Sequence, residues 1–277
     1  MGAPDKSLAQ ALSRLRTLEL PALPGHKEEQ MKASAIEFRF RMLIQVVIVL
    51  LGFLAPWIPI YDLQRRVSLL EWLALHISRA GLLPFTAAAP AVVAVGALVA
   101  LLGALLRVWG TACLGYGTVH HGQMQGAALT AAGPYRYVRN PLYLGGWFSM
   151  LAIALLMPPT GALVAMPLMT LFLLRLILGE EAFLAGCLGA PYQSYLSAVP
   201  RLFPRLRATL PLSGLKPRWL TAILTEVTPI GVFVTFAFLS WTYDNELMIK
   251  GILVSFGLSL VAKAVAMSKT KAGPAAS

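Results

Sequence analysis

Long apolar stretches alternate with short polar segments along most of this chain. Six of the stretches are long or apolar enough to predict helices that cross a membrane. The third is the shortest, since its residues would cover roughly 25 Å as a helix. The pattern predicts an all-α, polytopic membrane protein with about six transmembrane helices. The predicted spans lie at about 40–60, 88–109, 141–157, 161–179, 220–241 and 247–267.

Composition and charge agree with a membrane protein. Hydrophobic residues make up 57% of the chain and charged residues 13%, with a mean hydropathy of +0.70, whereas soluble chains carry roughly a quarter charged residues. All but four of the 23 Lys and Arg residues fall on one side of the six-span arrangement, and by the positive-inside rule that side is cytosolic. The net charge of +11 therefore reports membrane orientation, with both termini in the cytosol, and nucleic-acid binding is not expected. The four exceptions are Arg65, Arg66, Arg79 and Lys250.

The predicted spans divide the chain into four parts. Residues 1–38 form a cytosolic N-terminal segment in which leucines at helical spacing favour a short amphipathic helix on the membrane surface. Residues 39–110 hold the first two spans, joined by an external loop at 61–86 that is expected to carry an interfacial helix. A central part at 111–218 contains the helical hairpin and most of the polar residues, and 219–277 hold the last two spans and a tail.

The most polar part of the centre is residues 133–145, termed here the motif segment. Gly133-Pro134 is a turn signal. Asn140-Pro141 predicts a helix start, because Asn suits the N-cap and Pro suits the first helical position. The polar and aromatic residues that could serve a site here are Tyr135, Arg136, Arg139, Asn140 and Tyr143.

A second polar segment, residues 180–201, follows the hairpin formed by the third and fourth spans. Since the two helices of a hairpin run antiparallel, the ends that carry the motif segment and Glu180-Glu181 should meet. We therefore expect a cytosol-facing pocket near Arg139 and Glu180. Arg175 could instead pair with the two glutamates, and the arginines could form an ordinary positively charged rim. No metal site or disulfide is expected, because Cys113 and Cys187 lack ligand spacing.

Three stretches resemble one family. They are GALLRVWGTACLG at 103–115, GPYRYVRNPLYLGG in the motif segment, and EEAFLAGCLGAPYQSYLSAVPRLFP from Glu180 onward. Together they resemble the integral-membrane methyltransferases, which include isoprenylcysteine carboxyl methyltransferases and phospholipid (phosphatidylethanolamine) N-methyltransferases. The resemblance covers roughly 96–205 and implies that 111–218 is a methyltransferase core using S-adenosylmethionine. The family commonly has His where this chain has Asn140, so proton transfer at that position is not expected.

The resemblance and the chemistry of the donor together suggest roles for the polar residues. Arg139 would orient the acceptor or the donor carboxylate, and Glu181 would take a proton from an amine acceptor. Tyr195 could hold the sulfonium by its ring face or, with Tyr192, simply pack. The residues expected to bind the cofactor are Tyr135, Arg136, Asn140, Tyr143, Glu180 and Tyr195.

Four functions remain open from the sequence. The first is methylation of a membrane-embedded acceptor that enters from the bilayer, with the carboxylate of an isoprenylcysteine favoured. The second is methylation of a phospholipid amine. The third is an NADPH-dependent reductase of the sterol-reductase type, whose C-terminal hairpin motif is similar. The fourth is a scaffold or transporter without catalysis, although no ionisable residue clearly lies in the middle of a predicted span.

Overall fold

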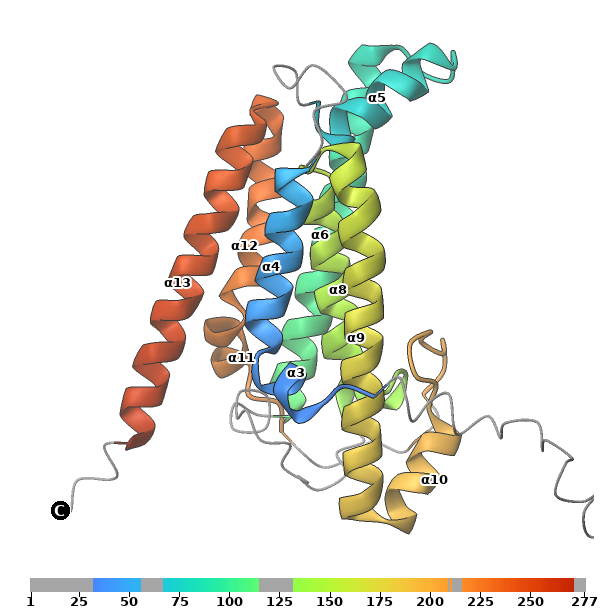
Figure 1. Ribbon diagram of the computed structural model, residues 1–277, viewed down its shortest axis with the longest axis vertical. Coiled ribbons are helices and arrows are strands. Elements are labelled where there is room, and N and C mark those ends of the chain that lie inside the picture. Colours follow the sequence, from blue (N-terminus) through green and yellow to red (C-terminus); the bar gives the residue numbers. More distant parts are fainter. Residues whose placement is uncertain (1–31, 56–66, 115–131, 209, 211–215, 272–277) are drawn as a thin grey trace, which may run out of the picture.

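The computed structural model describes residues 32–55, 67–114, 132–208, 210 and 216–271 (Figure 1). Regular structure in these residues consists of helices. The amphipathic helix predicted around Leu8–Leu15 lies outside them. The helices are α3 (Ala35–Arg39), α4 (Arg41–Leu54), α5 (Leu69–Arg79), α6 (Phe85–Leu114), η1 (Gly133–Arg136), α8 (Pro141–Ala154), α9 (Pro159–Leu188), α10 (Ala190–Ala198), α11 (Trp219–Thr225), α12 (Val227–Val234), η2 (Thr235–Leu239), η3 (Ser240–Thr242) and α13 (Asn245–Lys271).

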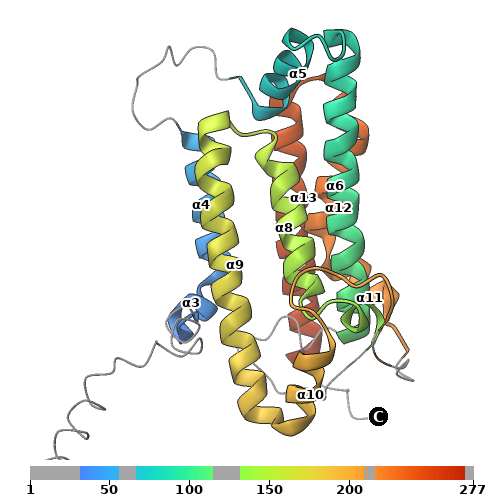
Figure 2. The same cartoon turned by 90° about the vertical axis from the view of Figure 1, so that its right-hand side faces the viewer.

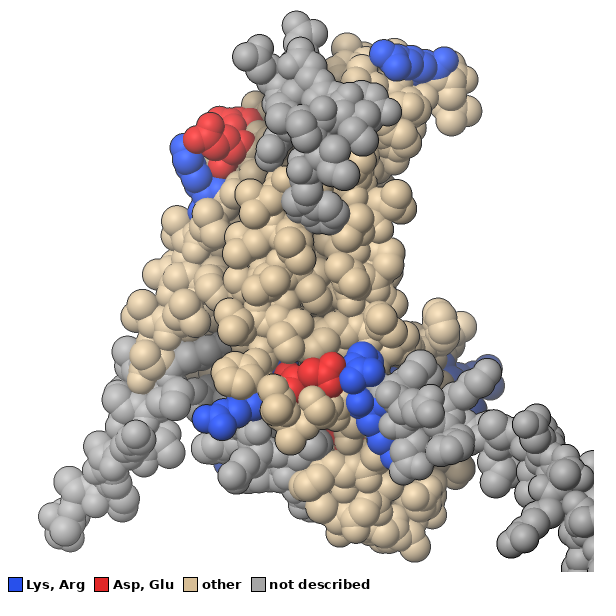
Figure 3. Space-filling model, viewed as in Figure 1, with Lys and Arg blue, Asp and Glu red and all other residues tan. Residues whose placement is uncertain are grey.

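Each of the six predicted spans contains at least one apolar helix. By length and composition α6, α9 and the Asn245–Ala262 part of α13 can cross a membrane. α4 and α8 have 14 residues each and are shorter than a full span. Figure 3 shows a broad surface without Lys, Arg, Asp or Glu between charged groups near the two ends of the molecule. The all-helical fold is confirmed, with three candidate spans among the described residues, or four if the bent pair of α11 and the stretch after it is one span. The count of six crossings stays a prediction.

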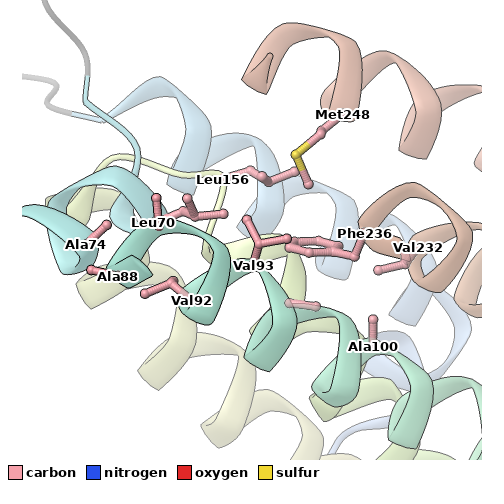
Figure 4. Close-up of a cluster of buried hydrophobic side chains, with 12 residues drawn as sticks. Leu70, Ala74, Ala88, Val92, Val93, Ala100, Leu156, Val232, Phe236 and Met248 are labelled. Carbon is pink, nitrogen blue, oxygen red and sulfur yellow. The ribbon is translucent and has the colours of Figure 1, made fainter. Parts of the chain in front are cut away.

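The long helices stand side by side in a bundle (Figures 1 and 2). α6 packs along α8 and α12, and α9 packs along α4 and α8. An apolar core lies toward the end of the bundle that carries α5. It is enclosed by α6 and by the α12–α13 region (Figure 4). Phe236 lies fully buried in this core against Gly96 of α6. The buried apolar surface therefore holds α6 and α8, whose first turn belongs to the motif segment, in fixed positions.

Close contact between α6 and α8 depends on two glycines. A Cβ atom on Gly103 would lie 2.9 Å from the Gly145 carbonyl oxygen, and one on Gly145 would lie 2.9 Å from the Gly103 carbonyl oxygen. Contacts this short are not tolerated by real side chains, so the two backbones approach only because both positions lack a side chain. The close approach at Gly103, in the second predicted span, thus fixes the position of α8 along α6.

Helix α9 of the hairpin extends beyond the fourth predicted span. Pro158 precedes the first residue of α9, which then continues without interruption to Leu188. The fourth predicted span and the residues up to 188 form one helix, because the Glu and Ala residues beyond the apolar stretch are good helix formers that continue it. Gly189, with a φ of +61°, turns the chain into α10.

The fifth predicted span is broken. α11 and the helical stretch from Val227 to Thr242 meet at an angle of 71°. Pro229 explains the break, because its ring would clash with the carbonyl group of Thr225, four residues earlier, and it has no N–H to donate there. Glu226 is the residue at the corner, with φ −99° and ψ 36°.

Candidate functional site

Glu181, near the end of α9, is bound by residues from both polar segments. Arg139 Nη1 lies 3.1 Å from Glu181 Oε2, and Arg201 Nε lies 3.0 Å from the same oxygen. Asn140 Nδ2 donates to Glu181 Oε1 at 2.9 Å. Glu181 is only 6% exposed, so these bonds replace its hydration. We call Arg139, Asn140, Glu181 and Arg201 the Glu181 cluster, and it places the motif segment against the second polar segment.

The start of α8 explains how Arg139 and Asn140 reach Glu181. Helix α8 begins at Pro141, as the sequence predicts, but the Asn140 side chain does not cap it. The amide instead donates to Glu181 and, at 3.2 Å, to the carbonyl oxygen of Arg201. The backbone N–H of Arg139 donates to the carbonyl oxygen of Pro200 at 2.9 Å. The motif segment is thus fastened to the chain after α10 by both backbone and side chain.

The two adjacent glutamates have different partners. Glu180 accepts a hydrogen bond of 2.8 Å from the hydroxyl of Tyr143, on the first turn of α8. Glu181 instead accepts hydrogen bonds from Arg139, Asn140 and Arg201. The first turn of α8 therefore contacts both carboxylates, through Asn140 and through Tyr143, and the predicted proximity of the two polar segments is seen in these contacts.

Two buried polar atoms of the motif segment have no hydrogen-bond partner among the described residues. They are the hydroxyl of Tyr135 and Nε of Arg139. Burial raises the pKa of Tyr135 well above its ordinary value, so the hydroxyl stays protonated at neutral pH and can donate. Buried donors are normally satisfied, and these two therefore mark a place where a ligand atom could accept.

Tyr195 has a contact of a different kind. Its hydroxyl donates to the backbone carbonyl of Tyr135 at 3.0 Å, and its ring lies 5.8 Å from that of Tyr192. Both rings are buried with Val199 in a small apolar cluster between α9 and α10. Of the two roles that the sequence left open, this geometry favours packing. Arg136 donates from Nε to the carbonyl oxygen of Leu210 at 2.7 Å.

A second buried carboxylate was not recognised as part of a cluster from the sequence. Glu226, at the corner between α11 and α12, accepts from Arg107 Nε at 2.6 Å and from Arg107 Nη2 at 2.9 Å. Thr111 Oγ1 donates to Glu226 Oε1 at 2.6 Å. Arg107 Nη1 also lies 3.4 Å from the carbonyl oxygen of Leu142, in the first turn of α8. We call Arg107, Thr111 and Glu226 the Glu226 cluster.

Arg175 does not bind the two glutamates of its own helix. Its Nε and Nη2 each donate to a carboxylate oxygen of Glu37 at 2.9 Å. The suggested pairing with Glu180 and Glu181 is therefore wrong, because residues five and six positions apart do not share a helix face. Hydrogen bonds from Arg175, together with the Ser34 backbone, lower the pKa of Glu37 from 4.5 to about 2. This pair fastens α3 to α9.

A comparison with protein families identifies the central region. Residues 91–190 match the model of the phospholipid methyltransferase family. This segment is a phospholipid methyltransferase domain. The resemblance inferred from the motifs is thereby confirmed, and the domain together with the apolar helices indicates an integral membrane methyltransferase. Neither the curated proteins nor the solved structures searched contain a match.

The phospholipid methyltransferase domain does not include every residue of the two clusters. It contains the motif segment, Glu180 and Glu181, as well as Arg107. Arg201 and Glu226 lie beyond its last matched residue. Each cluster thus joins the domain to chain that follows it.

Proposed function

We propose that this protein transfers a methyl group from S-adenosylmethionine to a lipid-type acceptor embedded in the membrane. The observation that carries the proposal is the Glu181 cluster, which places two guanidinium groups at the junction of the hairpin and the motif segment. The motif segment also holds two buried donors, the Tyr135 hydroxyl and Arg139 Nε, that have no partner among the described residues. The phospholipid methyltransferase domain supports the same reaction class.

The described residues fit such a donor in charge and hydrogen bonding. Arg139 Nε is a buried cationic donor without a partner in the described chain, which suits a carboxylate such as that of the methionine moiety. The N-terminus of α8, uncapped by Asn140, adds backbone N–H groups and a partial positive charge close to Arg139. The Tyr135 hydroxyl is a third donor without a partner there. Glu180, held by Tyr143, would face the ammonium or the ribose hydroxyls.

S-adenosylmethionine supplies an electrophilic methyl group on a positively charged sulfur. The residues of this chain then have to hold the acceptor in line with that methyl group and exclude water. Arg139 and Arg201 are suited to orient a carboxylate, since they carry two positive charges against the single charge of Glu181. A carboxylate acceptor is already ionised at neutral pH and needs no base.

The first candidate acceptor is the C-terminal carboxylate of an isoprenylcysteine. Both oxygens of Glu181 already accept hydrogen bonds, three in all, so Glu181 could take a proton from an amine only after losing one of these donors. The second candidate is a phospholipid amine, which the description of the matching family favours. For that acceptor Glu180, whose side chain accepts a hydrogen bond from Tyr143, is the better placed base.

In this proposal the Glu181 cluster faces the cytosol, where S-adenosylmethionine is made, and both termini lie on that side. The positive-inside distribution of Lys and Arg supports this orientation. The acceptor would reach the cluster laterally from the bilayer, because its apolar part is insoluble in water.

The test is methyl transfer by the purified full-length protein in lipid vesicles, with radiolabelled S-adenosylmethionine. A prenylcysteine analogue and a phosphatidylethanolamine are compared as acceptors in parallel. The proposal and its first acceptor are supported if the prenylcysteine analogue becomes a labelled ester. The Arg139→Ala variant should lose this activity and the Arg175→Ala variant should keep it. Label in the amine supports the second acceptor. No label in either, combined with stabilisation by NADPH but not by S-adenosylmethionine in thermal unfolding, overturns the proposal.

A further inference from the structure

The chain between α10 and α11 exposes large apolar side chains next to arginines. Phe203 is 88% exposed and Leu206 is 100% exposed. Arg205 and Arg207, which flank Leu206, are exposed as well. We call residues 201–207 the Phe203 loop. Full exposure of two large apolar side chains within four residues is unfavourable in water. It indicates that this loop contacts another molecule.

The base of the Phe203 loop is held firmly. Arg139 N–H donates to the carbonyl oxygen of Pro200, and Arg205 N–H donates to that of Tyr137 at 3.1 Å. Arg205 Nη1 donates to the carbonyl oxygen of Ala198 at 3.1 Å. The exposed side chains are thus presented by a loop whose backbone is fixed to the motif segment.

The position of the loop points to lipid as its partner. In both ribbon views the chain beyond α10 turns back along the bundle and reaches the level of α11 (Figures 1 and 2). At that level α11 itself exposes Trp219 and Leu220, by 49% and 73%. The Phe203 loop therefore lies at a level where apolar side chains of another helix also face outward, and its arginines suit the phosphate groups at the border of a bilayer.

We propose that the Phe203 loop is a membrane anchor. Phe203 and Leu206 insert into the leaflet at the end of the molecule that carries the Glu181 cluster. Arg205 and Arg207 bind anionic lipid headgroups at its surface. Because Arg139 and Asn140 are hydrogen-bonded to Pro200 and Arg201, the anchored loop holds the motif segment at a fixed depth beside the bilayer. This inference concerns lipid contact and does not depend on which acceptor is methylated.

The first test measures the depth of the loop. A fluorophore is attached at Leu206→Cys in a full-length Cys113→Ser, Cys187→Ser background, and in parallel at Ser194→Cys, an exposed position on α10. The protein is reconstituted in phosphatidylcholine vesicles. We expect nitroxide groups on the acyl chains to quench the label at 206 several-fold more than the label at 194, and aqueous iodide to do the reverse. Equal iodide quenching at both positions overturns the anchor and leaves the loop as a surface for a soluble partner.

The second test measures the contribution of charge. Adding phosphatidylglycerol to the vesicles should increase nitroxide quenching at 206. The paired change Arg205→Gln and Arg207→Gln should abolish that increase, whereas Arg79→Gln, at an exposed arginine on α5, should leave it intact. If the paired variant keeps the full increase, the arginines do not bind anionic lipid and that part of the proposal is wrong.

Discussion

Two buried carboxylates, Glu181 and Glu226, organise different parts of this molecule in different ways. Each is bound by guanidinium and by one uncharged donor, Asn140 or Thr111. Glu226 takes two hydrogen bonds from a single arginine. Glu181 divides its bonds between two arginines from separate segments, Arg139 and Arg201.

This difference separates a structural pair from a site. Arg107 binds Glu226 through two hydrogen bonds, and this bidentate pair closes the corner where α11 meets α12. In the Glu181 cluster two positive charges meet one, and Arg139 Nε lacks a partner among the described residues. We infer that the Glu226 cluster mainly contributes to stability and that the Glu181 cluster can also donate hydrogen bonds to a ligand.

The largest effect is expected on stability at Glu226. Replacing it by Ala leaves Arg107 and Thr111 without their acceptor, and breaking a buried pair in this way costs about 3–5 kcal/mol. The free energy of unfolding, from titration with a denaturing detergent, measures this. The paired change Arg107→Met and Glu226→Leu should recover about half of the loss or more, because apolar pairs often replace buried ion pairs at little cost. A small effect of Glu226→Ala would place the pair in a solvated position.

The next largest effect is expected on activity at Arg139. Arg139→Ala should lower kcat/KM about 100-fold, equivalent to about 2.7 kcal/mol in the transition state. Its unfolding free energy should fall by only about 1–2 kcal/mol, because Glu181 keeps Arg201 and Asn140. Arg139→Lys, which keeps the charge and loses the planar fork, should be intermediate in activity.

The matched control for Arg139 is Arg175→Ala. This variant removes an arginine from another ion pair of α9, with Glu37, outside the Glu181 cluster. Its kcat/KM should stay within about twofold of the parent. If both variants lose activity equally, the loss reflects the hairpin as a whole and not the cluster.

A smaller effect distinguishes two tyrosines of the motif segment, Tyr135 and Tyr143. Tyr135→Phe removes a buried hydroxyl without a partner in the described chain, so the unfolding free energy of the protein alone should not fall. Its dissociation constant for S-adenosylmethionine should rise about tenfold, or about 1.4 kcal/mol. Tyr143→Phe breaks the bond to Glu180 and should lower stability even without the donor. Calorimetric titration and unfolding of both variants test this, and unchanged donor affinity in Tyr135→Phe would remove Tyr135 from the site.

The sequence predicts the parts of the site that depend on local chemistry and on the hairpin. Asn140-Pro141 marks the start of α8 because of the geometry of proline, and Pro158 marks the turn. An antiparallel hairpin necessarily brings its two open ends together, so the contact between Arg139 and Glu181 follows from topology. The sequence is informative wherever a short-range rule applies.

Other features depend on contacts between distant helices and could not be read from the chain. Arg107 and Glu226 are 119 residues apart, and each has an ordinary explanation by itself as a residue at the end of a span. Pro229 was a signal for the break before α12, since its ring disfavours a continuous helix through Thr225. The choice of partner by Arg175 was open as well, because Glu37 comes from a segment whose position the pattern does not specify.

The smallest effect concerns the ion pair of Glu37 with Arg175, which serves as a reference for the two clusters. The lowered pKa of Glu37 alone would imply a larger contribution. The side chains of Glu37 and Arg175 are 27% and 30% exposed, however, so solvent screening should reduce the contribution of the pair to less than about 1 kcal/mol. The pKa of Glu37 is lowered from 4.5 to about 2. A carboxylate whose pKa is lowered in the folded state stabilises that state at pH values above its ordinary pKa. The difference in unfolding free energy between the parent and Glu37→Gln should therefore be constant above pH 4.5 and vanish as the pH falls toward 2. Thermal unfolding in a non-ionic detergent across this range measures it, and a difference that persists at pH 2 would show that the pair acts by packing and not by charge.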